Sequence, residues 1–169
     1  MVSDGIAARC GTAFTPYEHY SPWNFDRRGE PVPQPPTEDR NLALNLVLHG
    51  LFDQQRLIEL LRGYVAYAQT PGGLVKRIAR AHHYFAVSAA VDKTVVATRG
   101  DGKAGVVWHT QGSRKSMEME LFAHQIMTHP ALGNPTIVVL TDRIDIDDQL
   151  YDAFAASDLL GDPAQAVRG

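Results

Sequence analysis

One segment constrains the fold of this chain more than any other. An apolar run at residues 105–108 leads into a polar stretch, which ends in Lys-Ser at the start of a helical pattern. Strand, loop and helix in this order are typical of a nucleotide phosphate site. Backbone amides surround the phosphates, the lysine reaches the β and γ oxygens, and the serine hydroxyl binds Mg²⁺. The predicted phosphate loop comprises Thr110, Gln111, Gly112, Ser113, Arg114, Lys115 and Ser116, with Ser116 as the metal ligand.

Arg114 departs from this pattern, because a glycine is expected immediately before the Lys-Ser pair. Glycine adopts backbone conformations that residues with a Cβ avoid. An L-residue forced into the left-handed region costs roughly 1–2 kcal/mol, and a long side chain must also fit into a tightly wrapped anion site. The positive charge of the arginine favours phosphate, but the anion needs the amide cage first. We therefore expect ATP and Mg²⁺ to bind weakly.

Several short sequence motifs occur along the chain in the order that is typical of one protein family. Residues 105–116, followed by residues 134–150, resemble motifs I and Ia of the restriction (R) subunit of type I restriction-modification enzymes. The resemblance continues upstream at residues 2–5, 8–9, 11–12, 18–20, 22–23, 50–52, 56–58 and 60–62. It covers nearly all of the chain except the last dozen residues, and a series of motifs in a fixed order is more specific than any single motif.

The resemblance implies an ATP-dependent type I site-specific deoxyribonuclease, which translocates double-stranded DNA and works with methylation and specificity subunits. Its cofactors are ATP and Mg²⁺. The implied fold class is α/β: an incomplete P-loop motor domain of helicase superfamily 2, RecA-like, preceded by a helical segment and the tail of a nuclease domain. The family's nuclease carboxylates and Walker B acids are expected outside residues 1–169. We therefore expect a truncated or interrupted gene product that lacks activity alone.

Prolines divide the chain. Pro31, Pro33, Pro35 and Pro36 remove backbone donors and favour extended conformations. Together with the resemblance, they predict four segments. These are the C-terminal end of a nuclease domain at 1–28, a proline-rich linker at 29–39, a helical lead-in with the N-terminal part of the ATPase domain at 40–160, and a frayed tail at 161–169.

Apolar spacing and helix breakers predict the elements. Five helices are expected. The first spans 42–51, the second runs from an Asp53 cap to Ala68, the third from about 74 to 98, and the fourth from 116 to about 128. The fifth is a short helix that follows residues 136–140 and ends at about 154. Buried strands are expected at 104–108 and 136–140, where apolar residues predominate. The fold that the resemblance implies places other strands between these two. We therefore expect the two strands of the isolated chain to mispair with each other or to be covered by another copy.

His83 lies in a second candidate site. Residues 81–87 resemble the Q-motif region of the family, where glutamine normally stands at the position of His83 and reads the adenine edge. A neutral imidazole has its donor and acceptor on opposite sides of the ring, so adenine selectivity is not expected. In the alternative interpretation, His82 and His83 are partly exposed helix residues without a binding role.

Residues 137–142 look like a strand that ends in a Walker B aspartate. The residues on either side of this segment resemble motif Ia instead. The resemblance implies that Thr141 and Arg143 lie near the DNA backbone. Asp142 or Asp145 then caps the next helix.

Composition restricts the remaining classes of function. Hydrophobic residues make up 44% and charged residues 21%, and no apolar run suits a membrane span, so we expect a cytoplasmic protein without a membrane partner. The formal net charge of −3 requires any DNA contact to be local. Two alternatives to the fragment remain: a non-catalytic interaction module of a restriction complex, and a degenerate P-loop nucleotide-binding protein.

Overall fold

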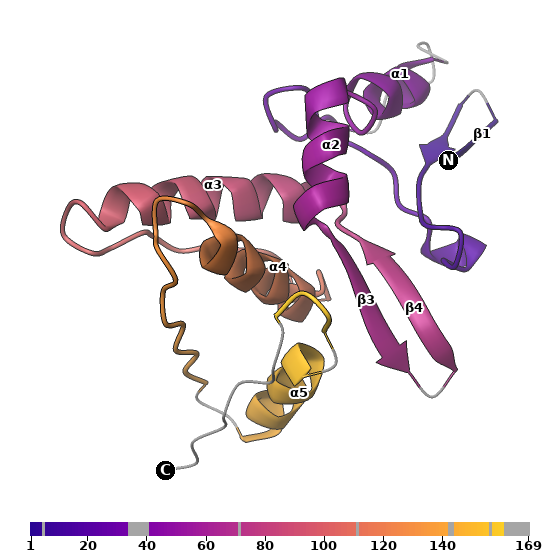
Figure 1. The fold of residues 1–169 in the computed structure, drawn as a ribbon. Coiled ribbons are helices and arrows are strands. Elements are labelled where there is room, and N and C mark those ends of the chain that lie inside the picture. Colours follow the sequence, from indigo (N-terminus) through magenta and orange to yellow (C-terminus); the bar gives the residue numbers. More distant parts are fainter. Residues whose placement is uncertain are drawn as a thin grey trace. The chain divides into compact units, whose positions relative to one another are not determined.

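The structure, a computed structural model, describes residues 1–4, 6–33, 41–70, 72–110, 112–141, 144–155 and 157–160 (Figure 1). Most of the predicted linker and the whole predicted tail lie outside these residues. The chain forms two compact units, one of residues 1–65 and 75–85, the other of residues 66–74 and 86–169. Helices and strands occur together, which confirms the α/β class in its general form.

The first unit begins with short strands held by turns. Strand β1 (Val2–Ser3) pairs antiparallel with β2 (Ala8–Arg9), and the 3₁₀ helix η1 (Tyr17–His19) follows. The carboxylate of Asp26 then accepts hydrogen bonds from the amides of Arg28 and Glu30, at 2.8 and 2.9 Å. This aspartate closes a turn through its side chain, which is the usual role of Asp in loops.

Helices α1 (Leu42–His49) and α2 (Gln54–Gly63) follow in the same unit. The predicted first helix is confirmed, and Gly50 is its C-terminal cap. The predicted cap of the second is confirmed as well, because the Asp53 side chain accepts a hydrogen bond from the Arg56 amide at 3.1 Å. This bond satisfies one of the amides that a helix N-terminus leaves without a backbone acceptor.

A β-hairpin replaces the predicted ends of two helices. Strands β3 (Val65–Thr70) and β4 (Gly73–Ile78) pair with each other, so the expected helix up to Ala68 and the expected helix start at Leu74 are wrong. Ala66 and Ala68 are buried, while Val65 and Tyr67 are more exposed. This alternation has the period of a strand, which the three-and-four spacing of the preceding helix concealed.

The second unit contains most of α3 (Ala81–Ala97) and all of α4 (Lys115–Thr128) and α5 (Ile144–Ala155). The predicted helices after residue 115 and up to about residue 154 are confirmed. Buried Glu120 of α4 accepts a hydrogen bond from the Ser157 hydroxyl, and a ring nitrogen of His124 lies 2.9 Å from the Leu159 carbonyl oxygen. Polar side chains therefore hold the segment after α5 against α4.

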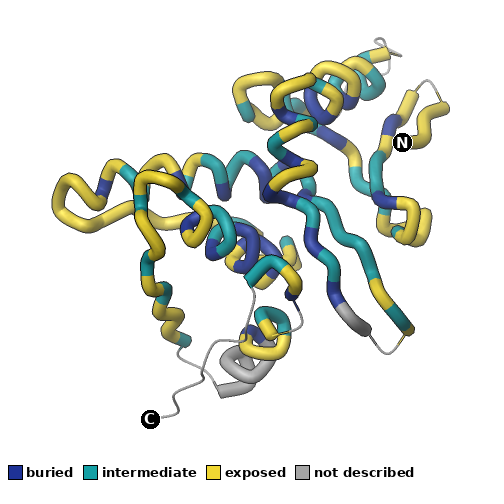
Figure 2. Tube along the Cα trace, in the orientation of Figure 1, coloured by how far each residue is buried: buried dark blue, intermediate teal, exposed yellow. Residues whose placement is uncertain are grey.

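The two predicted buried strands are wrong. Residues 104–108 and 136–140 form no strand, and Figure 2 shows both segments mostly exposed. Val106 is 91% and Trp108 87% exposed, and Val138 and Leu140 are 76% and 89% exposed. A buried strand needs neighbours for its amides, its carbonyls and both of its faces. The described part of the chain gives these two segments no strand neighbour.

A buried guanidinium organises the first unit. Arg56 donates to the carbonyl oxygen of Gly50 and to that of Arg27, both at 2.9 Å. Its guanidinium carbon lies 5.0 Å from the ring centre of Phe85 and 5.6 Å from that of Tyr84. Aromatic faces attract cations, and the two carbonyl oxygens satisfy donors that burial would otherwise leave unpaired. Arg56 thus links the N-terminal segment to the two helices that follow it.

Candidate phosphate loop and its relatives

The backbone of the candidate loop turns sharply where α4 begins. Gly112 has a φ angle of 83°. Arg114, at the N-cap of α4, has φ 60° and ψ 50° and lies in the left-handed region. Glycine adopts this region without penalty, whereas an arginine there costs roughly 1–2 kcal/mol. The loop thus has a glycine-like conformation at a position without glycine.

The first turn of α4 presents the groups that an anion requires. Lys115 and Ser116 are its first two residues, and both are exposed. The first amides of a helix have no intrahelical acceptor, and the helix dipole favours negative charge at this end. The next two amides, of Met117 and Glu118, point back to the Arg114 carbonyl oxygen at 3.1 and 3.4 Å.

Space in the loop is compatible with a phosphate. A Cβ built on Gly112 would meet no atom within 4 Å. The Arg114 side chain is exposed, so it is not buried inside the loop. Thr110 is exposed, and its carbonyl oxygen accepts a hydrogen bond from the Ser113 amide at 3.4 Å. Gln111 lies outside the described residues. A lysine, a hydroxyl and helix N-terminal amides therefore fit a phosphate with Mg²⁺.

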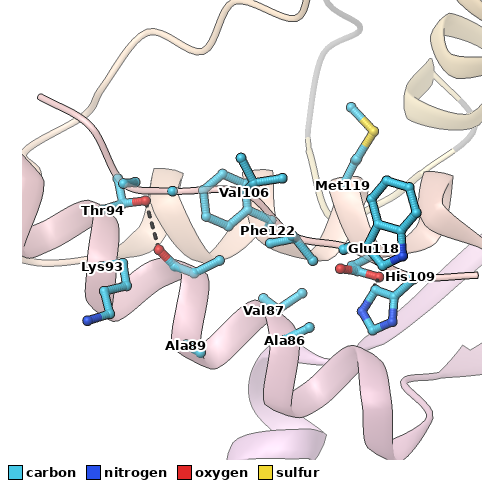
Figure 3. A pocket seen from close by; sticks show the side chains of 15 residues that line it. Ala86, Val87, Ala89, Lys93, Thr94, Val106, His109, Glu118, Met119 and Phe122 are labelled. Atoms are coloured by element: carbon cyan, nitrogen blue, oxygen red, sulfur yellow. Dashed lines mark hydrogen bonds and ion pairs between the residues drawn. The ribbon is translucent and has the colours of Figure 1, made fainter.

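An acid and a base join the two ends of the loop. Nε2 of His109, just before the loop, lies 3.2 Å from Oε2 of Glu118, just after it, and the two form an ion pair when the imidazole is protonated (Figure 3). Burial raises the pKa of Glu118, while His109 and Lys115 act in the opposite direction on that pKa. The sequence analysis did not predict this pair, because two residues that are nine positions apart across a loop match neither the helical nor the strand periodicity.

A cavity of about 710 Å³ lies beside this pair, between α3, residues 104–109 and α4 (Figure 3). Its lining is mainly apolar, with Val87 and Ala89 from α3, Val106 from the extended segment, and Phe122 from α4. Alanine and valine side chains leave this space unfilled. An apolar lining does not suit a phosphate, so the candidate anion site is the loop itself.

Comparison with known proteins places the chain in a family. The SWI2/SNF2 ATPase family matches residues 82–168. The type I restriction enzyme HindI endonuclease subunit of Haemophilus influenzae is 37% identical over 171 residues, which cover 99% of this chain and 16% of that protein. The chain belongs to the endonuclease subunits of type I restriction enzymes.

A second relative of this endonuclease-subunit family is more distant. The putative type I restriction enzyme MjaIXP endonuclease subunit of Methanocaldococcus jannaschii is 28% identical over 92% of the chain. The chain spans only 16% of the length of each of these two endonuclease subunits. No solved structure matches it.

His83, the other nucleotide candidate in this endonuclease-subunit chain, is fully buried at the start of α3. Its Nδ1 accepts a hydrogen bond from the Arg80 amide at 3.4 Å, and its ring centre lies 4.0 Å from that of His82. The interpretation of His83 as partly exposed is therefore wrong, although it holds for His82. His83 belongs to the first unit and the loop to the second.

The remaining candidates give less information. Thr141 is partly exposed, Asp145 lies in the first turn of α5, and Asp142 and Arg143 lie outside the described residues. Within the described ranges, no group of three or more His, Cys, Asp or Glu side chains is placed to hold a metal ion. Among the same residues, no helix is both long and apolar enough to cross a membrane.

Proposed function

We propose that the chain is part of an endonuclease subunit whose complete form couples ATP hydrolysis to DNA translocation and cleavage, and that it contributes a phosphate loop without turnover of its own. The observation that carries this proposal is the loop before α4. Its backbone is left-handed at Arg114, and Lys115 and Ser116 occupy the first turn of the helix. Membership in the family and the match to the SWI2/SNF2 ATPase family support a nucleotide as the ligand.

In this proposal, Lys115 and the first amides of α4 hold the β and γ phosphates, and the Ser116 hydroxyl is a ligand of Mg²⁺. Magnesium-bound ATP would supply the phosphoryl group for hydrolysis in the complete subunit. Thr141 and Arg143 contact the phosphate backbone of double-stranded DNA. Methylation and specificity subunits are the proposed protein partners.

The proposed domain organisation follows the resemblance. Residues 1–28 are the end of a nuclease domain, 29–39 a linker, 40–160 the helical lead-in and the first part of a RecA-like motor domain, and 161–169 a tail. Two extended apolar segments in one unit support the incomplete motor domain, because such a sheet needs strands beside them. The same exposed segments favour one alternative, a non-catalytic module that docks on a restriction complex.

We expect no ATP turnover by this chain. Phosphoryl transfer needs acidic side chains that position Mg²⁺ and the attacking water, and no Asp-Glu pair follows Asp142 in the sequence. Release of inorganic phosphate should therefore equal the buffer rate, with or without duplex DNA. Hydrolysis above the buffer rate that Lys115→Ala abolishes would refute this expectation.

Arg114→Gly is expected to strengthen the binding of ATP with Mg²⁺ by about tenfold, equivalent to about 1.4 kcal/mol. The exposed Arg114 side chain does not fill the loop, but it directly precedes Lys115, and its removal clears the approach of an anion to the first amides of α4. Relief of left-handed strain should in addition raise the free energy of unfolding by about 1 kcal/mol, because Arg114 is already strained without ligand. Titration calorimetry and urea unfolding measure the two effects.

Asn134→Gly is the matched control for this experiment. Asn134 has the same φ of 60° in the same unit but lies outside the loop. Asparagine tolerates this region better than arginine, so stability should change little and affinity for ATP should not change. Tight binding by the present sequence that Arg114→Gly abolishes would instead make the guanidinium a phosphate ligand.

A further inference from the structure

Glu118 places a negative charge at the end of the loop where a phosphate is expected. The residue lies in the first turn of α4, and its side chain is only 9% exposed. Its carboxylate lies 3.2 Å from the imidazole of His109, and Lys115 precedes it by three positions on α4, so the two residues are neighbours on the helix surface. Lys115 is the same side chain that the proposed function assigns to the phosphates.

A carboxylate and a phosphate are stabilised by the same positive electrostatic potential at the N-terminus of α4. The N-terminal dipole of α4 stabilises either anion, and so does the charge of Lys115. Two anions in one loop also repel each other, and a partly buried site screens this repulsion less than water does. The Glu118 carboxylate therefore lowers the positive electrostatic potential that would otherwise attract an anionic ligand.

We propose that Glu118 is an internal anion beside the phosphate loop, which compensates the charge of Lys115 in the ligand-free protein and lowers the affinity of the loop for phosphates. This inference rests on the proposed function and makes Glu118 an affinity-determining residue of the same site. Glu118 then acts beside Arg114 as a second and independent cause of weak nucleotide binding. The two residues act differently, since Glu118 contributes charge and Arg114 contributes a Cβ and a long side chain.

A purely structural ion pair makes the opposite prediction. If the contact between His109 and Glu118 only held the loop in shape, its removal would loosen the loop and weaken ligand binding. If Glu118 competes with phosphate, its neutralisation strengthens ligand binding. The sign of the change in affinity therefore separates the two roles.

The test is titration calorimetry of Glu118→Gln with ATP and with inorganic pyrophosphate, on the full chain in EDTA and at low salt. EDTA removes divalent ions, so the carboxylate cannot act as a metal ligand. Each variant is compared with the parent chain and again in an Arg114→Gly background, where binding is stronger. We expect Glu118→Gln to raise the affinity for both ligands by about tenfold or more, and less so at high salt.

Two further variants make the outcome decisive. Asp92→Asn removes one negative charge from an exposed position on α3 in the same unit and should leave the affinity unchanged. Glu118→Ser is a second neutral variant in case the glutamine disturbs folding, which circular dichroism reports. Unchanged or weaker binding by folded Glu118 variants, while Arg114→Gly binds ATP, overturns the inference and leaves the proposed function intact. A lack of binding by every variant, including Arg114→Gly with Glu118→Gln, contradicts both.

Discussion

Gly50→Ala is expected to lower the free energy of unfolding of the first unit by about 3 kcal/mol or more, at the upper end of the range for overpacking. The new Cβ would lie 2.2 Å from Nε1 of Trp23 and 2.4 Å from the carbonyl oxygen of Leu46. Trp23 is only 1% exposed, and the Leu46 carbonyl is part of the helix backbone, so neither can move away easily. Urea unfolding followed by circular dichroism and tryptophan fluorescence measures the loss.

Gly100→Ala is the control for this substitution. Gly100 also follows the end of a helix, but its nearest contacts for a new Cβ are ordinary, with the Ala97 carbonyl oxygen at 3.8 Å. Its stability should stay within about 0.5 kcal/mol of the parent chain. Equal losses in the two variants would show that the steric conflict around Gly50 is not the cause.

The isolated chain is expected to self-associate through its two extended apolar segments, and Trp108→Lys with Leu140→Lys should weaken this association strongly. Both side chains are almost fully exposed, and each offers about 1.5–3 kcal/mol when buried against a partner. Each lysine should therefore raise the dissociation constant by roughly tenfold or more. Sedimentation velocity over a range of protein concentrations gives the constants.

Val96→Lys provides the comparison. Val96 is 68% exposed on α3 of the same unit, so it tests a lone apolar residue outside the extended segments. This variant should associate as the parent chain does. A parent chain that remains monomeric at all concentrations would refute the expectation.

Local signals in the sequence predicted the elements that depend on local interactions. The Asp53 cap, the Gly50 stop and the start of α4 near Ser116 are each determined by a few neighbouring residues, and all three are confirmed. The sequence analysis did not predict the β3–β4 hairpin, although Pro-Gly-Gly at residues 71–73 marks a turn at the start of β4. Leu57, Leu60, Leu61 and Tyr64 fit a helical stripe, and that stripe was extended past Gly63 into a strand.

The prediction of two buried strands was wrong for a different reason. An apolar run shows that a segment suits burial, but burial also needs partners from distant parts of a sheet. The same limit applies to the candidate site. The order of residues placed Lys115 and Ser116 at a helix start, whereas the contact between His109 and Glu118 depends on how the loop turns. The burial of His83 likewise depends on packing that the helical pattern alone does not specify.

The left-handed backbone at Arg114 also has a genetic consequence. Every arginine codon differs from a glycine codon at its first base alone, so one point mutation exchanges the two residues. Because the main chain already has the conformation that glycine prefers, the exchange requires no rearrangement of the loop. The departure from the phosphate-loop pattern at this position is therefore a single base change away from the glycine that the pattern expects, on an unchanged main chain.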